Sequence, residues 1–304
     1  MTNSYVPLEG RLVHLSFEEA EKLAYQPLQG KILPAAGNKQ AHMMHGPVGA
    51  GKSTLARTLY ASLPDHTRRS TVYIGSDEHG AMDSIAAYRE GITGADAGTR
   101  HQLWQMYQND ADYIRSRTLD LAIGAGLSVF LDTTGGGSKG LQTVSILGNE
   151  NYPVTVSSCW APLPVCAKRI EGRERQADPA YLLTKRLGAY ESFLPLTSMV
   201  RTMNIYYSSA ADLAPGMVIS IMRTGLLDTP LKTTTIHPNL LSRMIRDMKL
   251  EGCGDWMNAL HDKALASRED HVALITGGNS LSTYLQRVGA GHLVPAQQGP
   301  LRVL

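Results

Sequence analysis

Residues 46–54 read GPVGAGKST, and this short stretch decides the fold of the chain. It matches the pattern G-x-x-x-x-G-K-[ST], in which glycines let the backbone turn tightly and bring its N–H groups around phosphate oxygens. The lysine of this pattern places a compact charge between the outer two phosphates, and the serine offers its hydroxyl to Mg²⁺. We therefore expect phosphate binding, with Ser53 as the metal-binding residue, at Gly46, Pro47, Val48, Gly49, Ala50, Gly51, Lys52, Ser53 and Thr54.

The segments on either side of this loop have the arrangement that the motif requires. Residues 42–45 read as a short strand that ends at the first glycine, and residues 52–63 read as a helix that Pro64 stops. A helix that starts at the loop also turns the positive end of its dipole toward the bound anion. The alternative, a glycine-rich turn with a chance lysine, does not account for this order of strand, loop and helix.

Strand and helix patterns alternate along the rest of the central region. Short apolar runs rich in β-branched or aromatic residues predict strands at 71–75, 127–131, 154–158 and 202–207. Helices are predicted between them, at 99–124, 164–173 and 179–193. Alternation of this kind predicts an α/β, three-layer P-loop fold with a mainly parallel sheet of five strands.

The two ends of the chain read differently from this central region. A short helix is predicted at 16–25, with Ser16 as its N-cap, and apolar patches at 239–287 predict further helices. We therefore expect three regions: an N-terminal helical lead-in (1–39), a P-loop core (40–214) and a C-terminal helical extension that packs on the core (215–304).

Composition excludes several classes of protein. The 304 residues are 43% hydrophobic and 18% charged, which excludes wholesale disorder. A net charge of +2 gives no electrostatic argument for a nucleic-acid or membrane partner, and the most apolar run, 119–131, is shorter than the ~18 residues of a membrane span. The N-terminus shows no secretory signal, and the three cysteines lack zinc-ligand spacing. We expect a soluble, cytoplasmic protein.

Other features distinguish among the classes of P-loop protein. The chain lacks the Asn/Thr-Lys-x-Asp motif with which GTPases read their base. The strand at 127–131 leads into Asp132-Thr133-Thr134 rather than the Asp-Glu pair usual in ABC and helicase-type ATPases. A small-molecule kinase fits better, because it needs an acceptor-side base, a Mg²⁺-binding loop and an arginine-bearing lid over the phosphates.

Two carboxylates follow strands of the predicted sheet. Ligands bind at the carboxyl ends of such strands, so Asp77, just after 71–75, can reach a substrate hydroxyl as a general base. Asp132, at the end of 127–131, can hold a Mg²⁺-bound water or hydrogen-bond the substrate. Each has a structural alternative: Asp77 could cap the next helix, and Asp132 could cap a turn.

Three arginines lie within the segment CAKRIEGRERQ (166–176). Arg169 and Arg173 are four residues apart and share one face of a helix, so they could close over the transferring phosphoryl group. Arg175 follows them. The alternative is a solvated surface helix in which Glu171 and Glu174 pair with these arginines.

Five segments spread over residues 40–210 resemble the zeta-toxin branch of P-loop kinases, near the polynucleotide-kinase-like group: GPVGAGKST, IGSD, LSVFLDTT, APLPVCAKRIEGR and MNIYYSS. The resemblance implies transfer of the γ-phosphoryl group of ATP, with Mg²⁺, to a sugar or ribose hydroxyl. Zeta toxins phosphorylate UDP-N-acetylglucosamine, and a related plant-pathogen effector phosphorylates NAD. The resemblance further implies a toxin, or an effector delivered into a host cell, with an antitoxin or chaperone-like protein as its inhibitor.

The same resemblance implies roles for individual residues. The phosphate loop would hold ATP and Mg²⁺, and Asp77 would be the base. Asp132 and Thr134 would contact the substrate. Arg169 would be the first lid arginine, and three residues are candidates for the second: Arg173, Arg175 and Arg186.

Two rival functions stay open at this point. A polynucleotide 5′-hydroxyl kinase would share the core, but the near-neutral charge and the lack of a basic tract argue against it. A regulatory nucleotide-binding module without transfer activity would not need a base such as Asp77. Two smaller features are read as structural: His45 as a satisfied histidine at a strand end, and Gly135-Gly136-Gly137 as a flexible loop rather than an anion-binding nest.

Overall fold

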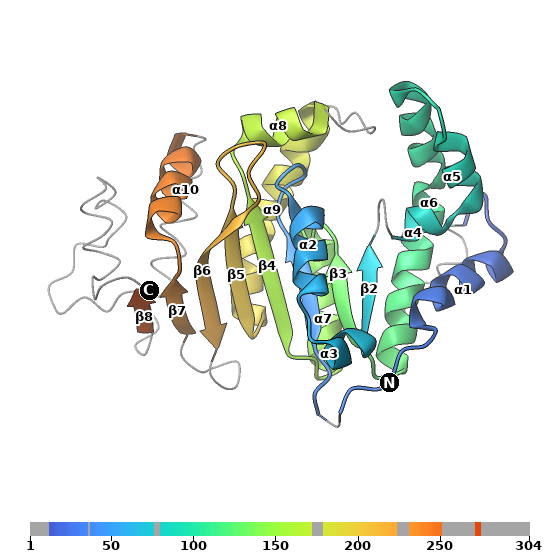
Figure 1. Ribbon diagram of the computed structural model, residues 1–304, viewed down its shortest axis with the longest axis horizontal. Helices are drawn as coiled ribbons and strands as arrows, with labels where there is room; N and C mark the ends of the chain where they lie inside the picture. Colours follow the sequence, from blue (N-terminus) through green and yellow to red (C-terminus); the bar gives the residue numbers. More distant parts are fainter. Residues whose placement is uncertain are drawn as a thin grey trace, which may run out of the picture. The chain divides into compact units, whose positions relative to one another are not determined.

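The motif lies between a buried strand and a helix, as predicted. β1 (Ala41–His45) leads into the loop and α2 (Lys52–Ala61) begins at Lys52 (Figure 1). The computed structural model describes residues 12–35, 37–75, 80–171, 179–223, 231–250 and 271–274. Contacts divide the chain into two units, which we describe separately: Met1–Ala41, Arg57–Thr133 and Ile170–Ala177 form the first, and His42–Ala56, Thr134–Arg169 and Asp178–Leu304 form the second.

The first unit holds two parallel strands. β2 (Thr71–Gly75) and β3 (Ser128–Asp132) pair in parallel, with Gly75 opposite Asp132. The long helix α6 (Ala97–Gly124) packs on both strands. β2 has the predicted bounds, and β3 and α6 begin and end within two residues of the predicted ones.

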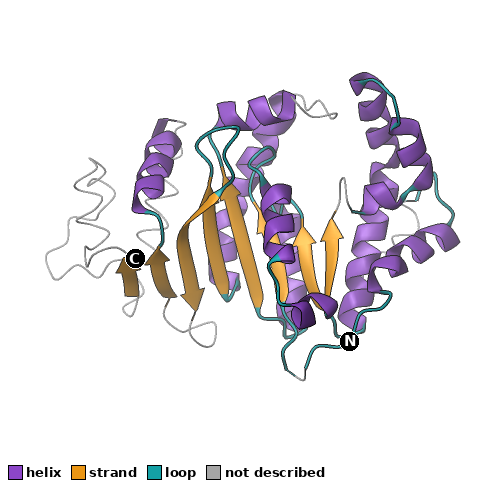
Figure 2. Ribbon diagram, viewed as in Figure 1, coloured by secondary structure: helices purple, strands orange, loops and turns teal. Residues whose placement is uncertain are grey.

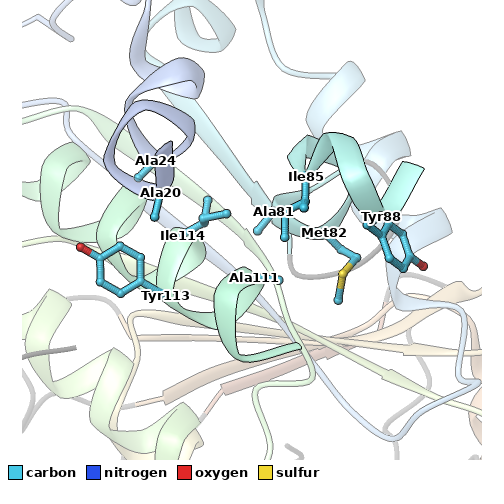
Figure 3. Packing of buried hydrophobic residues seen from close by; sticks show 9 residues of the cluster. All are labelled: Ala20, Ala24, Ala81, Met82, Ile85, Tyr88, Ala111, Tyr113 and Ile114. Carbon is cyan, nitrogen blue, oxygen red and sulfur yellow. The ribbon is translucent and has the colours of Figure 1, made fainter. Parts of the chain in front are cut away.

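Small helices cover the other side of α6. They are α1 (Phe17–Tyr25), η2 (Gln26–Leu28), α4 (Ala81–Ser84) and α5 (Ala86–Ile92), while α3 (Asp65–Arg69) precedes β2. The predicted cap is confirmed: the Ser16 hydroxyl accepts from the Glu19 N–H, and the Glu19 carboxylate accepts from the Ser16 N–H. Figure 3 shows the apolar cluster between these helices, built from Ala20, Ala24, Ala81, Met82, Ile85, Tyr88, Ala111, Tyr113 and Ile114.

Asp110 interrupts the apolar face of α6, and the structure explains why. Its carboxylate is fully buried and accepts from the backbone N–H groups of Val13 (2.9 Å), His14 (3.3 Å to each oxygen) and Leu15 (3.5 Å). Hydrogen bonds of this kind, with a charged acceptor, are stronger than neutral ones. Asp110 therefore ties the segment before α1 to the long helix.

We expect Asp110→Ala to lower the free energy of unfolding by about 2 kcal/mol or more, because hydrogen bonds to a charged acceptor contribute about 1.5–3 kcal/mol. Urea unfolding measures this change. The matched control is Asp112→Ala on the same helix, whose surface ion pair with Arg115 (3.6 Å) is worth about 0–1 kcal/mol. Equal losses for the two variants would contradict this role of Asp110.

The second unit contains most of the strands. Their order is β1-β4-β5-β6-β7-β8, where the new members are β4 (Val154–Trp160), β5 (Thr202–Tyr207), β6 (Gly216–Arg223), β7 (Leu231–Thr235) and β8 (His271–Leu274). β4 and β5 are parallel, as are β7 and β8, whereas β6 runs antiparallel to both of its neighbours. The prediction of an α/β P-loop fold with mainly parallel strands is confirmed.

Four helices accompany these strands (Figure 2): α7 (Gly137–Asn149), α8 (Leu163–Glu171), α9 (Pro179–Met199) and α10 (Pro238–Leu250). α7 packs on α9 and on β4. α10 packs on β5 and β6, where the Tyr207 hydroxyl donates to the Asp247 carboxylate. No helix of the described residues is both long and apolar enough to cross a membrane.

The structure of the C-terminal part differs from its prediction. We expected a helical extension after residue 214 and five strands in all, but β6, β7 and β8 raise the strand count of the described residues to eight. The physical reason lies in β-branched residues, the valine and isoleucines of GMVISIMR and the threonines of LKTTT, which favour strands. α10 agrees with the helical prediction; of the remainder of 239–287, residues 271–274 form β8 and the others lie outside the described residues.

Candidate nucleotide-binding site

The glycines of the phosphate loop lie against the backbone of neighbouring elements. Gly46 has φ +125°, and a Cβ atom there would lie 2.1 Å from the carbonyl oxygen of Cys159 in β4. Gly49 has φ +81°, and its Cβ would lie 2.6 Å from the carbonyl oxygen of Cys166 in α8. Only glycine fits both the conformation and the space. The loop is therefore held in one shape by β4 and α8.

Hydrogen bonds fix the loop further. The Gly46 N–H donates to the carbonyl of Thr134 (3.0 Å), and the Cys159 thiol donates to the carbonyl of Ala50 (3.0 Å). Lys52 is buried, and its Nζ donates to the carbonyl of Pro47 at 2.7 Å. The ammonium group therefore lies across the inside of the loop, where the motif requires a positive charge.

Donors remain available in this loop. Among the described residues, the backbone N–H groups of Val48, Gly49 and Gly51 have no hydrogen-bond acceptor, although Gly49 and Gly51 are buried. A buried N–H without an acceptor is costly and rare in proteins. Backbone donors of this kind within one loop form a cradle for an anion, and the start of α2 adds its dipole. The loop is built to accept phosphate oxygens.

The segment after β3 lies beside the loop. The carbonyl of Thr134 accepts from Gly46, so this residue sits at the start of the phosphate loop. Gly135 has φ +59°, and a Cβ there would lie 2.5 Å from the carbonyl of Met44. Residues 135–137 were read as a flexible loop from the sequence, but Gly135 makes a close backbone contact with β1, and α7 begins at Gly137.

Arg169 connects the phosphate loop to the segment that follows β5. Its guanidinium donates to the carbonyl of Gly49 at 3.3 Å. Its other acceptors are the Ser208 hydroxyl (2.6 Å) and the carbonyls of Ala210 (2.8 Å), Ala211 (3.0 Å) and Leu213 (2.7 Å). All of these acceptors are neutral, and within the described part of the chain no ion pair joins Arg169 to Glu171. A positive charge therefore stays next to the loop.

Of this segment, residues 208–215, the sequence motifs include Ser208 and Ser209; the part that follows was not identified from the sequence. Pro215 approaches Gly51 so closely that a Cβ atom at Gly51 would lie 3.0 Å from its ring. Apart from Asp212, the residues of the segment are small or apolar and follow no known spacing, so no local pattern marks those after Ser209. They belong to the site because Arg169 and Pro215 bring them to the loop.

Arg186, a candidate for the second lid arginine, is buried. Its guanidinium donates to the carbonyl of Ala161 at 3.0 Å and lies 3.8 Å from the Cys166 sulfur. It also lies over the ring of Tyr190, 5.4 Å from the centroid. Arg186 thus lies next to Cys166, the residue of α8 whose backbone packs on Gly49. The other two candidates, Arg173 and Arg175, lie outside the described residues.

Asp132 lies in the first unit, at the carboxyl end of β3. Its carboxylate accepts from the Tyr73 hydroxyl at 2.9 Å, and Tyr73 stacks on Phe130. Burial, and then the Asp132 charge, raise the pKa of Tyr73, so this tyrosine stays protonated as a donor. Gly75, the last residue of β2, is opposite Asp132. Asp77 follows two residues later, outside the described residues.

His45, the residue before the loop, is held by a buried hydrogen-bond network. Its Nδ1 lies 2.8 Å from the Ser158 hydroxyl, and its Nε2 lies 3.1 Å from the Ser192 hydroxyl. Trp160 donates to Ser158 and Ser192 donates to the carbonyl of Gly188. These directions are all satisfied when Nε2 carries the proton and Nδ1 accepts, so the network assigns a neutral ring. The reading of His45 as a structural residue agrees with this network.

Electrostatics keep this ring neutral. Burial and, to a smaller extent, the nearby Lys52 ammonium lower the pKa of His45 to about 3. Because the pKa of this histidine is lower in the folded chain than the value of 6.5 expected in the unfolded chain, protons bind the unfolded chain more readily. The fold therefore has its full stability above about pH 6.5, and its free energy of unfolding decreases as the pH falls from there toward 3. At pH 5 the loss is about 2 kcal/mol, from 1.5 pH units at about 1.36 kcal/mol each.

We therefore expect the stability advantage of the wild-type chain over His45→Gln to shrink by about 2 kcal/mol between pH 8 and pH 5, because only the wild type must protonate this buried ring. Urea unfolding of both proteins at the two pH values measures the difference. His42, whose pKa burial lowers to about 4, is present in both proteins and cancels. An advantage of the same size at both pH values would show that His45 does not titrate as described.

Comparison with known proteins adds a family match to this geometry. A family model described as an AAA domain matches residues 42–195, about half of the chain. The match begins within β1 and ends within α9, so it includes the whole phosphate loop. A search of curated proteins found no match.

Solved structures that resemble the chain share little of its sequence. One belongs to the PezAT chromosomal toxin-antitoxin system of the human pathogen Streptococcus pneumoniae; it is 15% identical, with a TM-score of 0.45, and the match covers 64% of this chain and 80% of that one. An AvrRxo1-ORF1:-ORF2 structure with ATP is 14% identical, with a TM-score of 0.45 and coverage of 67% and 64%. The chain thus spans less than two thirds of this second structure's chain.

Proposed function

Because the chain belongs to the AAA-domain family, we propose that it is a Mg²⁺- and ATP-dependent kinase with an alcohol acceptor. The acceptor we propose is a hydroxyl of a nucleotide-linked sugar or a dinucleotide, such as UDP-N-acetylglucosamine or NAD. This substrate class comes from the resemblance of the sequence motifs to zeta toxins and related effectors. The resemblance also supports a cytoplasmic site of action, as a toxin or delivered effector, and an antitoxin or chaperone-like inhibitor as partner.

One observation carries the nucleotide-binding part of this proposal. The buried N–H groups of Gly49 and Gly51 have no acceptor among the described residues, and the Lys52 ammonium lies across the same loop. Together they offer directed donors and a charge to a polyphosphate. The Arg169 guanidinium adds a second cation, bonded to the Gly49 carbonyl.

The donor set also fits Mg²⁺. Ser53 lies in the first turn of α2, directly after Lys52, and a single hydroxyl is enough because Mg²⁺ bound to a nucleotide keeps phosphate oxygens and waters as its other ligands. The ion would neutralise charge on the β- and γ-phosphate oxygens. Lys52 would contribute the charge nearest to the transferring group.

The remaining roles concern the acceptor. Asp77 would take the proton of the acceptor hydroxyl while the oxygen–phosphorus bond forms and the bond to ADP breaks. Asp132, which the Tyr73 hydroxyl orients, and Thr134 would hold the substrate. Arg169 would position residues 208–215 against the loop and contribute positive charge, with Arg173, Arg175 or Arg186 as a second arginine.

Transfer of label from γ-labelled ATP tests the proposal. The full-length protein is incubated with Mg²⁺ and, separately, with UDP-N-acetylglucosamine, NAD and an RNA oligomer with a 5′-hydroxyl. Label on either small molecule, lost in Lys52→Ala and kept in the exposed control Lys168→Ala, would support the proposed kinase. Label on the RNA alone would indicate a polynucleotide kinase. Binding of ATP without transfer to any of them, or to a metabolite extract, would indicate a regulatory module.

A further inference from the structure

A polar cavity lies in the first unit, at the amino end of β2. It has a volume of about 410 Å³ and is lined by residues of the segment after η2, the end of α2 and the helix α3, among them Lys31, Tyr60, Asp65, Arg68 and Arg69. Ligands of parallel sheets bind at the carboxyl ends of the strands, which is where the proposed reaction would take place. The cavity therefore has no place in the reaction proposed above.

Cations dominate the charged groups of this cavity. Three of its lining side chains are positive, and Asp65 is the single negative one. Asp65 pairs with Arg68, which also donates to the carbonyl of Ala61 at 3.2 Å. Arg68 is thus both held in place and neutralised. The two other cations keep their charge.

Lys31 has neutral partners. Its ammonium donates to the Tyr60 hydroxyl and to the carbonyl of Arg68, each at 3.2 Å, and lies 5.9 Å from the centre of the Tyr60 ring. The Tyr60 hydroxyl in turn donates to the carbonyl of Thr71, so it is fixed as an acceptor for the lysine. An ammonium has three N–H donors, and two of them are used. One donor and the whole charge remain for a ligand.

Arg69 is free of side-chain partners. Among the described residues, its guanidinium makes no hydrogen bond and no ion pair, although its backbone carbonyl accepts from the N–H of Ile32 at 3.2 Å. All five of its donors are available. Ile32 is half exposed beside it, with 50% of its surface accessible. A planar guanidinium of this kind binds phosphate with two parallel hydrogen bonds.

We propose that this cavity binds the phosphate group of a small phosphomonoester. Two uncompensated cations, Lys31 and Arg69, match the two charges of such a group near neutral pH. The cavity is larger than inorganic phosphate needs, and Ile32 offers an apolar surface for the sugar or base that carries the phosphate. The ligand is thus a mononucleotide-like molecule, and this site is independent of the proposed kinase activity.

Isothermal titration calorimetry of the full-length Lys52→Ala protein tests the proposal, because that substitution weakens phosphate binding at the loop. The probes are AMP and inorganic phosphate. We expect both to bind, AMP more tightly, and binding to weaken about tenfold or more in Lys52→Ala proteins that also carry Arg69→Gln or Lys31→Gln, because each loses a charge-assisted hydrogen bond. The matched control is Arg89→Gln, which removes an exposed arginine of α5.

The design separates the proposal from its rivals. Arg69→Gln removes no contact within the described residues, so its melting temperature should equal that of the parent protein and a loss of binding cannot reflect unfolding. Unchanged AMP affinity in both cavity variants, or no binding of either probe at millimolar concentration, would overturn the proposal. So would binding of an RNA oligomer that depends on Arg69 while AMP and phosphate fail to bind. None of these outcomes depends on kinase activity.

Discussion

Lys52→Ala is expected to lower phosphoryl transfer by about 100- to 1,000-fold, the loss typical when one preorganised group facing developing charge is removed. The Lys52 ammonium lies inside the phosphate loop, bonded to the carbonyl of Pro47. Alanine removes the charge that we propose lies nearest to the γ-phosphate and leaves the loop glycines unchanged. Steady-state rates of label transfer at saturating ATP measure the loss, and titration with ATP measures the accompanying loss of affinity.

Lys52 is buried, so its replacement also needs a control for stability. The melting temperature of Lys52→Ala shows whether the fold survives, and Lys168→Ala, which removes an exposed lysine of α8, shows the effect of one charge less. Full turnover of a folded Lys52→Ala protein would contradict the proposal that this loop binds the ATP used for phosphoryl transfer.

Asp77→Asn is expected to bind ATP nearly normally and to transfer phosphate about 100 to 10,000 times more slowly, because general-base assistance is worth that much. Asparagine keeps the shape of the side chain and removes its charge and basicity. The residue follows β2, whose last residue is opposite Asp132 in the parallel pair. Asp132 thus lies at a strand end of the kind at which ligands bind in folds of this type, and Asp77 follows the neighbouring strand end in the sequence.

A structural role for Asp77 gives the opposite pattern. Loss of a helix cap costs about 1 kcal/mol of stability and leaves the rate per folded molecule unchanged. Melting temperature and turnover are therefore measured on the same sample. A lowered melting temperature with full turnover would remove Asp77 from the catalytic role, and Glu78 and Asp132 would be tested next.

The elements that could be predicted from the sequence are those that local patterns specify. β2 and β5 have the predicted bounds because each is a short run of β-branched or aromatic residues between clear breaks. The cap at Ser16 was also predictable, since both of its partners lie within four residues. The phosphate loop belongs to the same group, because its geometry follows from glycine positions within the motif.

Long-range contacts account for most of what could not be predicted. Asp110 reads as an interruption of a helical pattern, because its acceptor role depends on backbone groups about a hundred residues away. The contacts of Arg169 with residues 208–215 also join distant parts of the sequence, up to 44 residues apart. β7, with its run of threonines, illustrates a second limit: polar β-branched residues suit strands as well as loops, and tertiary pairing decides.

The close packing of Gly46 changes how variation at the loop should be interpreted. A methyl group at Gly46 would collide with the carbonyl of Cys159, and one at Gly49 with the carbonyl of Cys166, whether or not a nucleotide binds. In a saturation-mutagenesis library scored for folding alone, both positions would therefore reject every substitution, while the partly exposed Val48 would accept several. Invariance at these two glycines among descendants of this chain would record the proximity of two cysteine carbonyls, and it would persist even in lineages that no longer bound a nucleotide.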